Sequence, residues 1–192
     1  MTLAQIMTLA LRQLDEDPAD ISEYDDLFRM YANEGHRIAV TEYLKPRTTL
    51  PLHSNEAGHI PILGTGIARV IEVRRKTEDG RMDLHVPFHL DATGAFIVIP
   101  HKNADVGVLA EMQPCTLERD NDEPMLPDWA HSALVDYICY RHLLNGNMAK
   151  QQRGQQYLSR FYDVMRRITP IAYGSVRREI NLYGATDIRR WW

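Results

Sequence analysis

The chain has 192 residues and a formal net charge of −4, with 44% hydrophobic and 25% charged residues. These fractions are typical of a globular protein, and the length fits one domain with an appended arm. No basic segment leads into an apolar core near Met1, and no apolar run approaches the roughly 18 residues of a membrane span. We therefore expect neither a signal peptide nor a membrane helix. Cys115 and Cys139 have no metal-site spacing and are expected to be free thiols.

The charge is unevenly distributed along the chain. Residues 1–34 carry a net charge of −6, and residues 141–192 carry +7. This polarity suits identical subunits packed acidic edge to basic edge, pairing of the two ends within one fold, or a basic face near nucleic acid. The candidate subunit contacts are the charged residues Asp25, Asp26, Arg160, Arg166 and Arg167.

The first 44 residues predict two helices. Over residues 2–14 apolar residues recur at the spacing of a buried helical stripe, and Thr2 with Gln5 forms a capping-box pattern at its start. Pro18 closes this helix. A second capping pattern begins a helix over residues 22–44, and Pro46 ends it. Its expected apolar face comprises Tyr24, Leu27, Phe28, Tyr31 and Ile38.

Between about residues 47 and 115 the pattern alternates with period two, which predicts a small inserted antiparallel sheet. The Asp79-Gly80 pair predicts a hairpin turn, and Pro87 predicts an edge strand or the end of a strand. Residues 50–66, rich in Pro, Gly and His, are expected to form a long loop. The expected strands are residues 67–74, 82–90, 96–100 and 106–111.

Helical spacing returns over residues 127–145 and 147–168, and Thr169-Pro170 is expected to close the last helix. From Ile171 onward we find no regular period. The predicted fold is therefore α+β and mainly helical. It consists of an α-helical bundle core over residues 1–168, with the inserted sheet, and an extended C-terminal arm over residues 169–192.

The arm is rich in aromatic residues and arginine, which anchor many protein interfaces, whereas disordered tails are usually poor in aromatics. We expect it to fold onto a partner protein rather than back onto its own domain. The residues expected to bind the partner are Tyr173, Arg177, Arg178, Leu182, Tyr183, Arg189, Arg190, Trp191 and Trp192.

No catalytic or cofactor-binding motif is present in the sequence. The glycine pair Gly64 and Gly66 is too short for a dinucleotide fingerprint and is expected to form a turn. His85 and His89 lie in a strand pattern, where their spacing does not bring metal ligands together. The acidic turn around Asp122 lacks the spacing of a calcium-binding hand. We expect no enzymatic activity, no metal and no cofactor.

The order of elements resembles a known family of viral proteins. Two helices that contain the phrase Met30–Ala39 precede a small sheet, which is followed by an acidic turn ending in Pro124–Pro127 and a helix that contains Ala133–Tyr137. Over residues 1–168 this resembles the head-to-tail adaptor (connector) proteins of tailed bacteriophages and prophages. The sheet insertion at residues 47–115 is longer than in the minimal helical adaptors.

The resemblance implies a structural virion protein in the neck of the particle, present in the host cytoplasm during assembly. Adaptors form a ring of twelve subunits under the portal protein, extend the DNA channel and dock the next neck or tail component. The resemblance also implies that the arm binds the portal. DNA would pass without specific binding, and no membrane would be involved.

Three other functions compete with this interpretation. The first is a head-closure or tail-completion protein of the neck, a class that tends to be dominated by sheet. The second is a nucleic-acid-binding module, which would use the C-terminal arginines. The third is a metal-dependent enzyme, which would use the scattered His and Asp residues.

Overall fold

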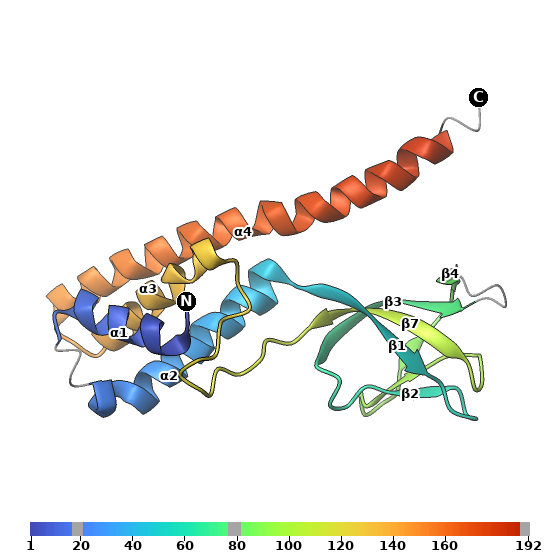
Figure 1. Ribbon diagram of the computed structural model, residues 1–192, viewed down its shortest axis with the longest axis horizontal. Coiled ribbons are helices and arrows are strands. Elements are labelled where there is room, and N and C mark those ends of the chain that lie inside the picture. The colour runs from blue at the N-terminus through green and yellow to red at the C-terminus, as the bar shows by residue number, and fades with distance from the viewer. Residues whose placement is uncertain (17–20, 77–81, 189–192) are drawn as a thin grey trace. The chain divides into compact units, whose positions relative to one another are not determined.

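The chain forms two compact units in the computed structural model (Figure 1). Unit 1 comprises Met1–Leu44 and Pro114–Trp192, and unit 2 comprises Lys45–Gln113. The structure describes the backbone of residues 1–16, 21–76 and 82–188, and within these ranges the side chains of all residues except 76–84 and 169–188. About 46% of the chain is helical and 21% is strand, which confirms the mixed α+β class.

Unit 1 contains the four α-helices of the described residues. These are α1 (Leu3–Leu14), α2 (Ile21–Ile38), α3 (Ser132–Leu143) and α4 (Met148–Ile188). A π-helical segment, η2 (Ala39–Leu44), extends α2, and a short 3₁₀ turn, η3 (Asp128–Ala130), precedes α3. The expected helices at 2–14, 22–44 and 127–145 are confirmed within a few residues.

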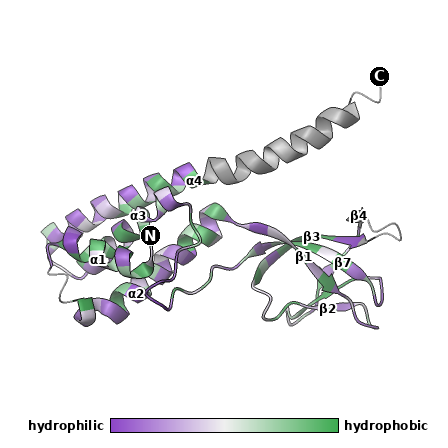
Figure 2. Cartoon of the chain, in the orientation of Figure 1, coloured by the Kyte–Doolittle hydropathy of each residue, from purple (hydrophilic) through white to green (hydrophobic). Residues whose placement is uncertain are grey.

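The buried helix faces form one core in unit 1, and Figure 2 shows how apolar and polar residues alternate along these helices. Phe28 of α2 and Phe161 of α4 are both fully buried. The ring of Tyr137 on α3 packs 5.0 Å from the ring of Phe161. Gly35 lets α2 approach that tyrosine closely, since a Cβ at this position would lie 2.8 Å from Cδ1 of Tyr137.

The predicted end of the last helix is wrong, because α4 continues past Thr169-Pro170 to Ile188. A proline removes only one amide donor from a helix, and the turns on either side can continue. The expectation of an extended arm without a regular period is corrected with it. Once the backbone is helical, the sequence shows apolar residues at 3-4-3 spacing, at Tyr173, Val176, Ile180 and Tyr183.

Unit 2 is built from two antiparallel sheets. The larger has the order β1 (Arg47–His53), β7 (Asp105–Met112), β3 (Ile67–Lys76) and β4 (Met82–His85). The smaller has the order β2 (His59–Pro61), β6 (Phe96–Val98) and β5 (His89–Leu90). They enclose a second core, separate from that of unit 1. Its buried residues are Ile60, Val73, Val86, Ile97, Ile99, Val106, Val108 and Ala110.

Two sequence-based expectations for unit 2 are wrong. Residues 50–66 are not one long loop, since they contain most of β1 and all of β2. Pro51 is accommodated because β1 is an edge strand of its sheet. The expected single sheet is also divided in two, because the run 82–90 separates at Pro87 into β4 and β5, which join different sheets.

Other expectations for unit 2 are confirmed. Pro87 does follow a strand end, and β3 pairs antiparallel with β4, as a hairpin requires. The turn residues Asp79-Gly80 themselves lie outside the described residues. Gly64 and Gly66 belong to a turn, and both have the positive φ that glycine adopts easily, 77° and 73°.

Candidate functional site

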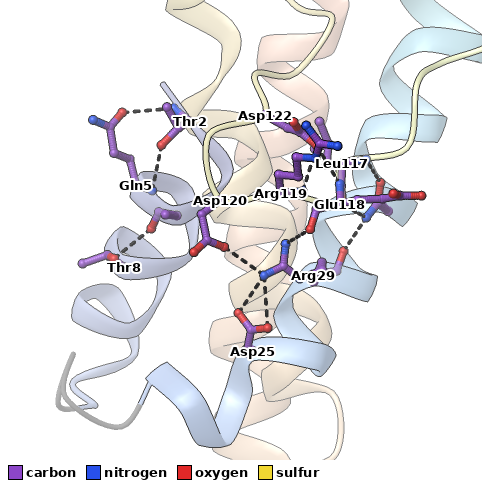
Figure 3. A network of polar contacts seen from close by, with 12 residues as sticks. Thr2, Gln5, Thr8, Asp25, Arg29, Leu117, Glu118, Arg119, Asp120 and Asp122 are labelled. Carbon is purple, nitrogen blue, oxygen red and sulfur yellow. Dashed lines mark hydrogen bonds and ion pairs between the residues drawn. The ribbon is translucent and has the colours of Figure 1, made fainter.

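A clamp of polar side chains on α2 holds the segment that leads from unit 2 back into α3 (Figure 3). One guanidinium nitrogen of Arg29 donates to the carbonyl of Glu118. The other lies 3.0 Å from carboxylate oxygens of both Asp25 and Asp120. Asp25, which we expected at a subunit contact, is therefore engaged within its own chain.

The clamp continues one and two turns further along α2. The side-chain amide of Asn33 makes two hydrogen bonds with the backbone of Leu117, accepting from its N–H at 2.7 Å and donating to its carbonyl at 2.9 Å. Nε2 of His36 accepts from the N–H of Met125 at 2.9 Å. His36 is 1% exposed, and burial lowers its pKa to about 4, while a hydrogen bond to the backbone of Cys115 opposes this shift.

The acidic turn caps the first helix. The first-turn N–H groups of Leu3 and Ala4 donate to the carbonyls of Asp122 and Asp120, at 2.8 and 3.1 Å. The carboxylate of Asp122 accepts from the N–H groups of Arg119 and Glu118, and these bonds lower its pKa. The turn thus accepts hydrogen bonds from N–H groups at the start of α1 that have no partner within the helix, a structural role that its sequence does not indicate.

The outward face of α2 carries exposed apolar residues among acidic ones. Leu27 is 38% exposed and Met30 is 53% exposed. Glu23 and Asp26, at helical spacing from them, are exposed as well. We call these four residues the α2 stripe. The expectation that Leu27 belongs to the buried face of this helix is wrong, because it lies about 100° around the helix from Phe28.

The exposed side of α4 carries arginines spaced seven residues apart, at Arg153, Arg160 and Arg167, which we call the α4 stripe. Seven residues are close to two helical turns, so the three lie on one face. The guanidinium of Arg153 lies 3.3 Å from a carboxylate oxygen of Asp15. The guanidinium of Arg160 stacks 5.4 Å from the ring centre of Tyr157.

The five expected subunit contacts do not converge on one place in the subunit. Asp26, Arg160 and Arg167 are exposed. Arg166 lies on a different side of α4, where it pairs with Asp163 at 3.0 Å. Among the residues whose side chains are described, the acidic residues of this set form no ion pair with its arginines. The acidic and basic ends of the chain do pair within the subunit elsewhere, through Asp15 with Arg153 and Glu34 with Arg141.

The expected portal-binding residues divide into two groups. Tyr173, Arg177, Arg178, Leu182 and Tyr183 belong to the helical backbone of α4, and their side chains are not described. Arg189, Arg190, Trp191 and Trp192 lie outside the described residues. Their role in binding stays a prediction.

Buried and half-buried ionisable groups lie around the core of unit 1. Burial raises the pKa of Asp136 to about 6 and that of the Cys139 thiol to about 12, so this thiol is unreactive near neutral pH. Glu34 pairs with Arg141 at 3.1 Å, and that guanidinium lies over the ring of Tyr31 at 5.3 Å. These contacts join α2 to α3.

Two histidines of unit 2 each lie near one acidic side chain. Nδ1 of His53 lies 2.8 Å from Asp105, and Nδ1 of His85 lies 3.9 Å from Glu72. In the described part of the chain, no three His, Cys, Asp or Glu residues are grouped so that they could hold a metal ion.

The described helices include none with the length and apolar character needed to cross a membrane. Comparison with known proteins gives no further identification, since no family model and no curated protein sequence matches the chain.

Proposed function

We propose that this protein is a head-to-tail adaptor of a tailed bacteriophage or prophage. In this role it forms a ring under the portal, extends the DNA channel and docks the next neck or tail component. The order of elements that underlies the resemblance is present in the structure: two helices, an inserted sheet unit, an acidic turn and two further helices.

The length of α4 is the observation that carries this proposal. Its last described buried residue is Ile168, yet the helix extends a further 20 residues to Ile188. Most of the stability of helices in proteins comes from packing of an apolar face, so we expect this extension to be packed against a partner. The sequence keeps an apolar stripe at Tyr173, Val176, Ile180 and Tyr183, which is the pattern of a helix that lies in a groove of a partner.

The stripe beyond residue 168 is in phase with the buried face before it. The spacings from Leu158 and Met165 to Val176 and Tyr183 are 11, 18 or 25 residues, which are close to whole numbers of helical turns, so these positions share one side of a straight helix. A partner that binds α4 would therefore continue the packing surface that α4 already uses in its own unit. The portal is the partner that the resemblance assigns to this segment.

Secondary-structure content and charge favour the adaptor over the other candidates. Helix exceeds strand by about two to one, at 46% against 21%, whereas head-closure and tail-completion proteins tend to be dominated by sheet. The net charge of −4 suits a channel that lets DNA pass, because each additional phosphate contact would add affinity.

The test is co-migration with the portal protein encoded in the same genome, measured by size-exclusion chromatography with light scattering. The full chain is expected to shift to a ring-sized complex with the portal. A chain without residues 169–192 is expected to lose this complex while it keeps the unfolding transition of unit 1. Equal binding by the full and shortened chains would contradict the proposal.

A matched pair of variants tests whether portal binding depends on the apolar face of α4 or only on the presence of residues 169–192. Replacing Tyr173, Ile180 and Tyr183 by alanine removes the apolar stripe and keeps a good helix former at each position. Replacing Ser175 and Asn181 by alanine changes positions away from the stripe. We expect only the first variant to lose the portal.

A further inference from the structure

We propose that the α2 stripe of one subunit binds the α4 stripe of a second copy of this chain. The inference rests on the proposed function, because it names the lateral contact of the ring. It replaces the expected set of contacts, in which Asp25 and Arg166 are engaged elsewhere within the subunit.

The helix α2 has three faces, and two of them are occupied. Phe28, Tyr31 and Gly35 face the core, and the clamp residues Arg29, Asn33 and His36 hold the segment 115–125. The third face is the α2 stripe. Two large apolar side chains on it, Leu27 and Met30, remain exposed beside carboxylates.

Such a surface is typical of a protein contact. Apolar side chains that can be covered lie beside charges that select the partner and fix its register. Glu23 and Asp26 select a partner of positive charge.

The same subunit carries a matching surface on α4. Arg153, Arg160 and Arg167 are exposed at 7-residue intervals along α4. Arg153 already pairs with Asp15 of its own subunit, so Arg160 and Arg167 are the main candidates for a contact with a second copy. The ring of Tyr157 holds the guanidinium of Arg160 in place, so less side-chain entropy is lost when this arginine pairs with a carboxylate. Val164, which is only partly buried, offers apolar surface between Arg160 and Arg167.

Within one subunit the two stripes lie on different helices, α2 and α4. Both helices pack against α3, and the described residues show no ion pair between the α2 stripe and the α4 stripe of one chain. A subunit that carries two different complementary faces makes a heterologous contact, which repeats from copy to copy and closes into a ring when the rotation allows. A second copy is therefore the partner that fits both surfaces at once.

The experiment uses two full-length variants, each altered on one face. The α2-stripe variant carries Asp26→Lys and Met30→Lys. The α4-stripe variant carries Arg160→Gln and Arg167→Gln. Both replacements are neutral, because acidic residues there would attract the lysines of the α2-stripe variant and because Asp136 interacts electrostatically with Arg160. Light scattering and sedimentation at several concentrations are expected to show self-association that is at least about tenfold weaker for each variant than for wild type.

Mixing the two variants gives the sharpest result. The α2-stripe variant keeps a native α4 stripe, and the α4-stripe variant keeps a native α2 stripe, so each mixed pair can make one native contact. We expect the mixture to form 1:1 dimers and to stop there, while neither variant dimerises alone. A control with Arg166→Glu and Glu56→Lys, both exposed and off the stripes, should assemble as wild type does.

Several outcomes would overturn the inference. These are unchanged assembly of both variants, a mixture that behaves like its components, or wild type that stays monomeric at millimolar concentration. Weaker retention of the α4-stripe variant on DNA, with assembly unchanged, would also overturn it, in favour of nucleic acid as the ligand. Portal binding is measured separately through residues 169–192, so failure of this contact and failure of the adaptor proposal give different results.

Discussion

His36 shows how one buried side chain makes folding depend on pH. Its imidazole accepts a hydrogen bond from Met125 only in the neutral form, and its pKa of about 4 lies below the ordinary 6.5. At a pH between these values the unfolded chain binds a proton at this histidine and the folded chain does not. The stabilisation from His36 is therefore complete above pH 6.5 and is lost as the pH falls toward 4.

We expect the free energy of unfolding to fall by about 2–3 kcal/mol from this group between pH about 7 and about 4.5. The measurement is urea unfolding of wild type and His36→Gln at both pH values. The variant is expected to be less stable near neutral pH and to lose less stability on acidification. His89→Gln, at an exposed histidine, is the control. Parallel losses in wild type and His36→Gln would refute the assignment.

The sequence predicted the buried apolar residues better than the polar residues of the clamp. Arg29, Asn33 and His36 are residue types that commonly lie on a solvated helix face. Their types do not reveal that each one forms a hydrogen bond with a backbone group 80 or more residues away in the sequence. Their spacing of i, i+4 and i+7 directly beside the buried stripe was the available signal. Leu27 is apolar and therefore looks like a core residue in the sequence, but its angle around the helix places it outside the buried face.

At the scale of elements, hydrophobic periodicity predicted the positions of the helices. Two wrong predictions, the long loop at residues 50–66 and the end of the last helix, both came from proline residues. Pro51 made a strand look like a loop because its position on a sheet edge is not visible in the sequence. Pro170 made a continuous helix look terminated. In both cases the free-energy cost of placing proline in a strand or helix was taken to end the element. A position on a sheet edge or intact helical turns on either side can offset that cost.

The approach of α2 to α3 depends on Gly35. A methyl group there would lie 2.8 and 2.9 Å from two ring carbons of Tyr137, which is closer than Cβ atoms pack. We expect Gly35→Ala to lower the free energy of unfolding by about 1–3 kcal/mol, although alanine is the better helix former. Thermal unfolding followed by circular dichroism measures this.

Gly154→Ala is the matched comparison for that prediction. Gly154 is also buried in a helix, but its nearest contact would be Cβ of Leu143 at 3.3 Å. We expect a smaller loss there, since a shift of a few tenths of an ångström relieves the contact. If Gly35→Ala is as stable as wild type, α2 is free to move away from Tyr137, and close packing is not the reason for the glycine.

At the scale of the whole molecule, the two units have separate cores. All residues of the larger core come from unit 1, and all residues of the smaller core come from unit 2. The chain enters unit 2 through Pro46 and leaves it after Met112, and the N–H of Met112 donates to the carbonyl of Pro46 at 2.9 Å. Entry and exit are therefore adjacent.

We expect unit 1 to fold without unit 2. In the test protein residues 47–112 are replaced by a short Gly-Ser linker between Pro46 and Gln113, a gap that about three residues can span. A cooperative thermal transition and a helical circular dichroism spectrum are expected. Loss of cooperativity would show that unit 1 needs unit 2 to fold.

The adjacent ends of unit 2 have an evolutionary consequence. An insertion whose termini leave side by side can be exchanged for another compact module with neighbouring ends, and the loop-closure entropy changes little. The helices of unit 1 need no compensating mutations for such an exchange, because the clamp on α2 holds the chain where it returns to unit 1. Recombination at this junction could change the surface of unit 2 without changing the surfaces of unit 1, including the α2 stripe and the α4 stripe.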